Sequence, residues 1–324
     1  MRPALFMILA PVVLVGQTSP AAAPQKAIAE AVYRLLARVA EEADAMQQNI
    51  PKTLTTETLE QRSVLPPGRF KPRDASGKAR GQRSTVRQVV SEYTVGKLAE
   101  SGDLHEFRQV TSVDGRVIES EARARRALAL GMQSQSDRAR KRMLEQLTQY
   151  GLVDIATDYG LILLEFLRRG WENLQFGPVA EARMGTDAAV VLGWRQLSTA
   201  GGELQFHGRR TVRESLAGRL WMRKSDGLPL RVEAWAEVED AGRRVRDQAT
   251  VDYVMSAHGF LTPASVVHRH MVDGKVMTEN LYRYQPFKMF SADAEIKFSE
   301  APEPTAEQPK RPEPPKEAPA PPEP

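Results

Sequence analysis

The segment Gly218–Val238 constrains the fold more than any other, because its side chains alternate in character after a turn. Ser225, Asp226 and Gly227 mark that turn. After it, one face of the chain is apolar: Leu228, Leu230, Val232, Ala234, Ala236 and Val238. The other face consists of Arg231, Glu233, Trp235 and Glu237. A period of two is typical of a strand with one buried face, so the segment predicts a β-hairpin in a sheet that is covered on one side.

The hairpin belongs to a long series of expected strands. Turn signals at Gly201-Gly202, Asp226-Gly227, Ala241-Gly242 and Asp273-Gly274 divide the region after Trp171 into short β-favouring runs. The expected strands are 53–64, 84–98, 104–118, 173–176, 188–197, 204–215, 219–223, 228–238, 243–255, 260–271, 275–284 and 292–298. Tight turns join antiparallel neighbours, so the sequence predicts a meander that must curl or close.

Two segments have the pattern of helices. Pro24–Asn49 carries apolar side chains at three- and four-residue spacing, which predicts an amphipathic helix. Gly151–Arg169 is apolar on most of its circumference, which predicts a helix that is either buried on both sides or laid over a hydrophobic cavity. The expected fold class is therefore α+β, a curved antiparallel β-sheet or open half-barrel with helices that cover its concave face.

A basic segment, Glu119–Gln149, precedes the apolar one. Its many arginines and low apolar content predict a solvated helix, so residues 119–170 are expected to form a helical insertion. Contact with an anionic surface is the alternative, and the net charge of the chain, +4, is too small to decide. Nucleic acid is not expected as a partner, because the segment lacks aromatic or base-reading side chains.

The N-terminus has the pattern of an export signal. Arg2 precedes an apolar run at Ala4–Val15, and Ala21–Ala23 offers a cleavage site. The run is shorter than the ~20 residues of a membrane span, so residues 1–23 are expected to be a cleavable signal peptide, with an uncleaved anchor as the alternative. No transmembrane span is expected in the mature chain. We therefore expect residues 24–300 to form a periplasmic or secreted domain.

The C-terminal residues 301–324 differ in composition from the rest. Ten are proline, five are glutamate, and none has a large apolar side chain. Such a segment cannot bury enough surface to offset its ordering entropy, which predicts a disordered tail. Binding of an envelope protein through this tail is one interpretation, and a solvated terminus without a role is the other.

Signatures of catalysis are absent from the sequence. There is no Cys, so disulfides, thiolate metal sites and a cysteine nucleophile are excluded. His268 and His270 share a strand face and are interpreted as two exposed histidines, because no third ligand is evident nearby; a metal site that His258 completes is the alternative. Glu233 and Glu237 alternate with Arg231, as on a solvated strand. We therefore expect no catalytic residue, no metal and no cofactor.

Several features together form a pattern that extends over residues 204–298 and, more loosely, the N-terminal helix. They are the export signal, the helix, and Gly218, Trp221, Asp226–Arg231, Tyr253, Gly259 and Pro263. This pattern resembles the periplasmic lipoprotein-carrier superfamily, which includes lipoprotein-sorting (LolA-like) and envelope-sensor (RseB-like) proteins. The resemblance implies an open half-barrel whose helices plug its concave face, with acyl chains bound in the cavity.

On this resemblance, the chain is expected to be a non-enzymatic carrier or sensor that binds lipid or acylated protein. The candidate cavity residues are Leu161, Leu164, Phe166, Leu167, Trp221 and Trp235. An envelope interaction or scaffold module, with a filled core and no ligand, is the alternative; it would use the basic helix and the Pro-rich tail. A hydrolase with a carboxylate pair is the third hypothesis. An open apolar cavity favours the first, a filled core the second, and facing carboxylates the third.

Overall fold

The structure is a computed structural model that describes residues 22–64, 84–97, 102–133, 137–155, 157–197, 203–207 and 210–290. The chain divides into two compact units, residues 1–289 and 290–324, and every helix and strand named below lies in the first. Most of the predicted signal peptide, the strand predicted at 292–298 and the predicted tail fall outside the described residues.

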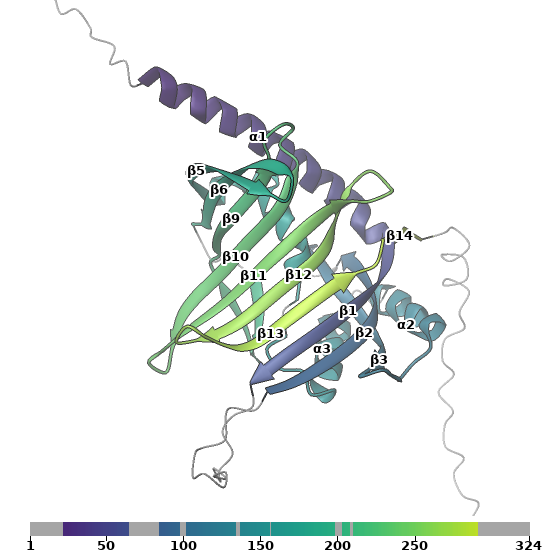
Figure 1. Cartoon of the computed structure of the whole chain (residues 1–324). Coiled ribbons are helices and arrows are strands. Elements are labelled where there is room, and N and C mark those ends of the chain that lie inside the picture. The colour runs from purple at the N-terminus through teal and green to yellow at the C-terminus, as the bar shows by residue number, and fades with distance from the viewer. Residues whose placement is uncertain are drawn as a thin grey trace, which may run out of the picture. The chain divides into compact units, whose positions relative to one another are not determined.

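One antiparallel sheet dominates the fold (Figure 1). Its strands follow the order β4-β3-β2-β1-β13-β12-β11-β10-β9-β6-β5, and β14 pairs with β1. In chain order they are β1 (Thr53–Val64), β2 (Ser84–Lys97), β3 (Leu104–Val113), β4 (Arg116–Val117), β5 (Leu174–Met184), β6 (Asp187–Gln196), β9 (Ala217–Arg223), β10 (Pro229–Asp240), β11 (Arg243–Met255), β12 (Leu261–Val272), β13 (Lys275–Tyr284) and β14 (Lys288–Met289). Among the described strands the two ends of this order do not pair, so the sheet is open. The predicted α+β fold with an open antiparallel sheet is confirmed.

The remaining elements are helices and one small hairpin. They are α1 (Ala22–Asn49), η1 (Ile50–Lys52), α2 (Glu121–Gln133), α3 (Asp137–Gln149), the 3-10 helices η2 (Tyr159–Phe166) and η3 (Arg168–Asn173), and the strands β7 (Glu203–His207) and β8 (Arg210–Glu214). Within the described ranges, no helix combines the length and the apolar content needed to cross a membrane.

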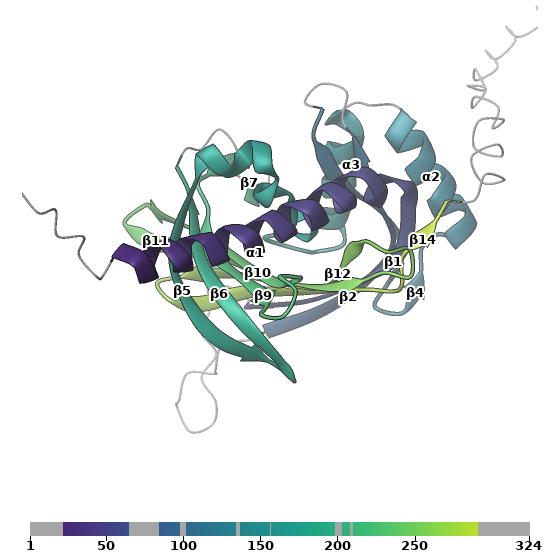
Figure 2. The ribbon, with the colours of Figure 1, turned by 90° about the horizontal axis from the view of Figure 1, so that it is seen from above.

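The core lies between α1 and the concave face of the sheet. Seen from above, α1 crosses the strands on one side (Figure 2). Its side chains Val39, Ala43 and Met46 are fully buried, at the helical spacing that the sequence predicted. The alternating side chains Val232 and Ala234 of β10 are buried on the same face, so the hairpin prediction is also confirmed.

The basic insertion wraps around the β3 end of the sheet. Leu54, Thr94 and Phe107 are consecutive cross-strand partners on β1, β2 and β3, on the face opposite the main core. Leu128 of α2 packs against this group, so α2 covers the convex face there. Leu147 of α3 belongs to the main core instead. The helices α2 and α3 therefore cover opposite faces of the sheet at its β3 end.

The apolar helix predicted at Gly151–Arg169 is wrong. Residues 152–155 and 157–158 are irregular, and two short 3-10 helices follow. Asp154 and Asp158 have left-handed backbones, with φ of 45° and 67°, which no right-handed helix accommodates. Apolar content was a correct guide to burial here, but it did not report the backbone conformation.

Two strand predictions also need correction. The single strand expected at 204–215 is the hairpin β7–β8. The short strand expected at 173–176 continues to Met184 as β5, because the pairing with β6 shifts register between Phe176 and Val179. Gly177 and Pro178 lie in that shift, where a β-bulge absorbs residues that otherwise end a strand.

Candidate functional site

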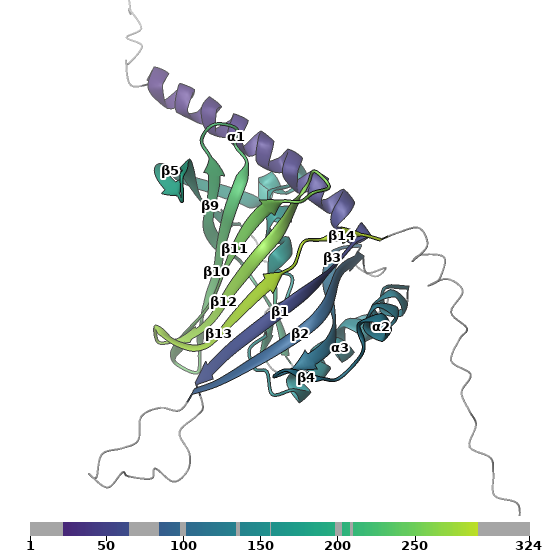
Figure 3. The same cartoon turned by 45° about the vertical axis from the view of Figure 1, so that its right-hand side comes forward.

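The 3-10 helix η2 lies at the centre of the core. It contacts α1 and the strands β11 and β12, and Figure 3 shows how α1 runs across the ends of these strands. Its sequence, YGLILLEF, is apolar apart from Glu165, and Leu163 and Phe166 are fully buried. We call the space that η2 fills between α1 and the concave face of the sheet the η2 site.

Small side chains make room for η2. Ala234 and Ala236 of β10 and Ala249 of β11 are buried on the concave face, and Ala234 and Ala249 are direct cross-strand partners. Protein interiors are packed without large voids, so short side chains in the sheet require a further layer above them. Without η2, this face would be a concave apolar surface of the kind that takes hydrophobic ligands.

Four of the six predicted cavity residues lie in or beside the η2 site. Leu161, Phe166 and Leu167 are buried, and Leu164 is half-buried and packs against the same core. The site is therefore filled by the protein's own side chains. The other two, Trp221 and Trp235, lie on the convex face: Trp221 pairs with Arg231, and Trp235 is stacked between Arg246 (4.8 Å) and Arg219 (5.9 Å). The structure does not bring them together with the first four.

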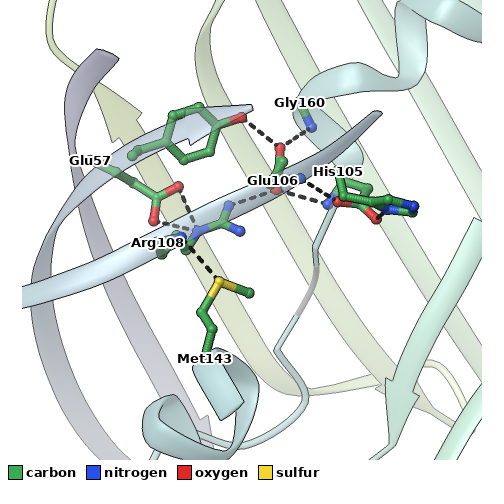
Figure 4. Close-up of polar contacts among 8 residues, drawn as sticks. Glu57, His105, Glu106, Arg108, Met143 and Gly160 are labelled. Carbon is green, nitrogen blue, oxygen red and sulfur yellow. Dashed lines mark hydrogen bonds and ion pairs between the residues drawn. The ribbon is translucent and has the colours of Figure 1, made fainter. Parts of the chain in front are cut away.

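Glu106 joins the start of η2 to the edge strand β3 (Figure 4). Its carboxylate accepts hydrogen bonds from the backbone N–H groups of Asp158 (2.7 Å) and Gly160 (3.0 Å) and from the Tyr93 hydroxyl (3.0 Å). In return, Asp158 accepts a bond from the Glu106 backbone (2.8 Å) and contacts Nδ1 of His105 (2.9 Å). The reciprocal pair satisfies backbone groups on an open sheet edge and fixes the position at which η2 enters the core.

Arg108 neutralises two buried carboxylates in the same cluster. Its Nε donates to both oxygens of Glu57 (2.7 and 3.0 Å), and its Nη2 donates to Glu106 (2.7 Å). The guanidinium lies over the rings of Tyr93 (5.2 Å) and Tyr282 (5.3 Å). All of these groups are almost fully buried, so the ion pairs are shielded from solvent. We call Glu57, Tyr93, Glu106, Arg108 and Asp158 the Glu106 cluster.

The electrostatics of the Glu106 cluster indicate a structural role. Burial raises the pKa of Glu57, although the charge and hydrogen bonds of Arg108 act in the opposite direction. Burial opposes the charge of Arg108, but the carboxylates of Glu57 and Glu106 outweigh it and raise the pKa of the guanidinium. Burial and the charge of Glu106 also raise the pKa of Tyr93. Every carboxylate here is held by donors and closed to solvent, so none is presented to a substrate.

No pattern in the sequence marks the Glu106 cluster. Glu57 alternates with threonines and Leu59 on the core face of β1, where the pattern gave no apolar stripe to mark the buried side. Glu106 and Arg108 are two residues apart and so share a face of β3, which is the one signal that could have paired them. Oppositely charged residues at this spacing also occur on solvent-exposed strands, so the spacing alone does not indicate a buried ion pair.

The interpretation of His268 and His270 as exposed is wrong. His268 is 3% exposed, and both rings contact the Oδ1 atom of Asp247, at 3.1 and 3.0 Å. The two histidines do share a face, as predicted, but they converge on a carboxylate. Within the described residues there is no group of three or more His, Cys, Asp or Glu side chains that could hold a metal ion.

A groove of about 910 Å³ lies on the sheet near the hairpin ends of β10–β13. It is lined by Glu237, Val238, Glu239, Gly242, Arg244, Arg246, Gln248, Met271, Asp273 and Gly274. Glu237 pairs there with Arg244 (3.2 Å) and Arg246 (3.6 Å), and Glu233 lies 3.9 Å from Arg219. These carboxylates are therefore ion-paired with their strand neighbours and do not face one another across a cleft.

Adding a methyl group at Gly160 tests the junction between η2 and the Glu106 cluster. A Cβ atom there would lie 2.6 Å from Oε1 of Glu106, so Gly160→Ala is expected to push η2 off the carboxylate and to destabilise the protein by about 1–3 kcal/mol. Hydrogen exchange should become faster in residues 157–166 than in β10. Gly131→Ala, where nothing lies within 4 Å, is the control. Unchanged exchange in η2 would contradict this assignment.

Comparison with protein-family models finds no match, and comparison with curated proteins finds none either. Among solved structures, the chain is similar to a LolA superfamily protein from Nitrosomonas europaea, with 12% identity over 80% of this chain and 94% of that one and a TM-score of 0.28. It is also similar to MucB, solved in complex with the periplasmic part of MucA, with 11% identity over 80% and 98% and a TM-score of 0.18. The first of these lies in the superfamily that the sequence pattern resembles. Scores this low transfer no residue, ligand or partner to this chain.

Proposed function

We propose that this protein is an exported, non-enzymatic carrier or sensor that binds the acyl chains of a lipid or an acylated protein in the η2 site. The proposal rests on the conformation and packing of η2, the segment that fills the η2 site. An apolar segment fills the concave face, but it belongs to no strand or α-helix, and a few hydrogen bonds hold it: from its start to Glu106, from its middle to Tyr253, and from its end to Gln196 and Trp171. Moving η2 away would open a site for a ligand without breaking the sheet. Export is supported by the predicted signal peptide at residues 1–23.

The energies of plug and ligand are comparable. Four large side chains of η2 that carry no polar atom are buried: Leu161, Ile162, Leu163 and Phe166. Exposing them to water costs about 6–12 kcal/mol, since each contributes about 1.5–3 kcal/mol when buried. Burying a sixteen-carbon chain contributes roughly 13 kcal/mol at about 0.8 kcal/mol per methylene. A long acyl chain can therefore replace η2, whereas a short or polar ligand cannot. The expected specificity is for chain length and apolar character.

Weakening the plug should strengthen ligand binding. Phe166 is fully buried, and its ring centroid lies 5.3 Å from that of Trp194. Phe166→Ala therefore removes about 3–5 kcal/mol of packing energy that holds η2 in the site and opposes its displacement by a ligand. We expect the affinity for palmitate to rise by at least tenfold, measured by native mass spectrometry of mature protein purified from a periplasm, with organic extraction in parallel. Trp235→Ala, on the convex face, is the matched control and should leave uptake unchanged.

One outcome of the uptake experiment would contradict the proposal. If wild type and Phe166→Ala both give clean protein masses, and neither takes up added palmitate, phospholipid or acylated peptide, the protein is not an acyl-chain carrier. Circular dichroism of both proteins must show that they are folded, so that loss of uptake is not loss of structure.

A second function, an envelope interaction module, is favoured by one observation. The η2 site is filled, while the groove near the ends of β10–β13 is open and carries paired charges. A photo-reactive residue at Met271 in the groove should then form a cross-link with one partner in the envelope, whereas the same residue at the exposed Val86 should not. Equal labelling from both positions would exclude a specific partner at the groove.

A further inference from the structure

A chain of hydrogen bonds runs from the segment before η2 into the sheet. Gln61 bonds to Val153 and to Asn280, and Asn280 bonds to Asp154 and to His268. His268 continues the chain to Asp247 on β11. We call Gln61, Asn280, His268 and Asp247 the His268 relay. It is buried, and neither the Glu106 cluster nor the proposed ligand uses it.

Backbone groups fix the direction of every bond in the relay. The N–H of Val153 can only donate, so the Gln61 atom that it reaches at 2.9 Å is the oxygen Oε1. The Gln61 amide then donates to the Val153 carbonyl and to Oδ1 of Asn280, both at 2.6 Å. The carbonyl of Asp154 can only accept, so the atom of Asn280 at 2.7 Å from it is Nδ2. Neither amide can be turned over without breaking a bond to the backbone.

This direction sets the protonation state of His268. Nδ2 of Asn280 is a donor and lies 3.2 Å from Nδ1 of His268, so Nδ1 accepts and carries no proton. The ring proton therefore sits on Nε2 and is donated to Asp247 at 3.1 Å. The relay fits a neutral imidazole in one tautomer only.

A second proton on His268 conflicts with the relay at Nδ1, although the Asp247 carboxylate at Nε2 attracts a charged ring. It would place an N–H on Nδ1 directly against the amide N–H of Asn280, two donors facing each other without an acceptor. Turning over the Asn280 amide would accept the new proton, but it would then set an oxygen against the Asp154 carbonyl and a nitrogen against the Gln61 amide. In the first case the bond from Asn280 to His268 is lost, and in the second the bonds of Asn280 to the Asp154 carbonyl and to the Gln61 amide are lost, so the sheet holds Asp154 less firmly.

At Nδ1, His270 meets an acceptor and not a donor. Its Nδ1 donates to Asp247 at 3.0 Å whether the ring is neutral or charged. Burial disfavours the charged form, but the hydrogen bond and the charge of Asp247 outweigh it and raise the pKa of His270. Protonation of His270 therefore strengthens its pairing with Asp247. The other groups around His268 are Tyr159 of η2, whose ring stacks on the imidazole at 5.5 Å, and Asp154, which accepts from Thr278 (2.8 Å).

The relay is placed where it can control η2. Val153 and Asp154 lie just before η2, and Tyr159 is its first residue. We propose that the His268 relay is a proton-operated latch: it holds Val153 on β1 and Asp154 on β13 while His268 is neutral, and it releases them, and with them η2, when His268 takes up a second proton. As a control of ligand binding, this latch rests on the proposed function. The release itself is a property of the chain without ligand.

Hydrogen exchange of the ligand-free mature protein tests the latch directly. Labelling times are scaled to the intrinsic exchange rate at each pH, and exchange of residues 152–166 is followed from pH 8 to pH 4. A single linked proton increases the opening equilibrium by up to about tenfold per pH unit. We expect protection of this segment to fall on acidification, while protection of β10 and β11 stays constant.

Three variants assign the effect to His268. His268→Gln cannot titrate, so its exchange should no longer depend on pH. His270→Gln should keep the acid release, because His270 does not block the relay. His105→Gln should also keep it, since His105 contacts Asp158 on the other side of the segment. An acid release that survives in His268→Gln, or a wild-type segment whose protection does not change with pH, would overturn the proposal.

If His268→Gln does not fold, the variant Asn280→Asp tests the latch independently. In Asn280→Asp the carboxylate can accept from a doubly protonated His268, so protection should be lower at neutral pH and should not fall further in acid. A release at the same pH as in wild type would count against the latch. Failure of palmitate to bind would leave these exchange results unaffected, so the two proposals can fail separately.

Discussion

Replacing Arg108 with methionine is expected to lower the free energy of unfolding by about 3–5 kcal/mol at pH 7. The substitution keeps much of the volume of the side chain but removes the only cation that contacts Glu57 and Glu106 within the described Glu106 cluster. Both carboxylates are 1% exposed, so neither can recover its lost partner from solvent. Urea unfolding, followed by circular dichroism, measures the change.

The loss should depend on pH with a definite sign. Burial already raises the pKa of Glu57 in the presence of Arg108, so this carboxyl favours folding in its protonated form, and that contribution is lost as the pH rises through its folded pKa. Without Arg108 the pKa rises further, because the attraction that lowered it is gone. The difference between variant and wild type should therefore be largest near neutral pH and shrink towards pH 4.

A charge-neutral control separates ion pairing from packing. The triple variant Glu57→Gln, Glu106→Gln and Arg108→Met removes the cation and both carboxylates that it contacts, and it should recover part of the stability lost in Arg108→Met alone. The recovery is incomplete because the amide introduced by Glu106→Gln has one acceptor oxygen, whereas the N–H groups of Asp158 and Gly160 bond to different oxygens of Glu106. If the triple variant is as unstable as the single one, the cluster contributes through shape and not through charge. The cluster also positions η2, since Glu106 accepts hydrogen bonds from the backbone N–H groups of Asp158 and Gly160 at its start.

Local patterns predicted the sheet because its order along the chain is nearly its order in space. The alternation of β10 gave the correct buried face, and the predicted bounds of β1, β11 and β13 match the structure. β-Strands joined by tight turns pair with their neighbours, so the meander β10–β13 follows from sequence alone. The pairing of β1 with β13 joins distant parts of the chain, and no local pattern reports it.

The same alternation could have corrected the choice of cavity residues. Trp235 stands on the polar face of the predicted hairpin, together with Arg231 and Glu233, and the structure places it there. Its choice as a cavity residue rested on its size and not on its face. Local apolar content marks Leu161 and Phe166, and it is a sound guide to burial even where the backbone is irregular.

The polar residues that organise the η2 site could not be predicted, for a physical reason. Glu57, Glu106 and His268 come from strands far apart in the sequence, and each looks like a residue of a solvated strand by itself. A buried polar group is stable only when its partners are in place, so its role is a property of the set. The left-handed Asp154 and Asp158 belong to the same set, since their backbone groups are the ones that Asn280 and Glu106 bind.

Adding a methyl group at Gly218 should have an effect almost as large as the loss of Arg108. A Cβ atom there would press against the carbonyl oxygen of Glu233 on β10 and lie 2.7 Å from the indole of Trp194 on β6. The carbonyl belongs to the sheet backbone and cannot move without breaking strand pairing. We therefore expect Gly218→Ala to destabilise the protein by about 3 kcal/mol, at the upper end of overpacking effects, and to change the fluorescence of Trp194.

Gly193→Ala is the matched control for this prediction. Gly193 lies on the adjacent strand β6, and the nearest atom to its added Cβ is 3.9 Å away, in ordinary van der Waals contact. It should change the free energy of unfolding by less than about 1 kcal/mol. If the two variants are equally stable, Trp194 does not pack over Gly218 as described. A selective loss in Gly218→Ala would fix the ring of Trp194 at the inner wall of the η2 site, against Phe166, where a displaced plug would leave it in contact with the ligand.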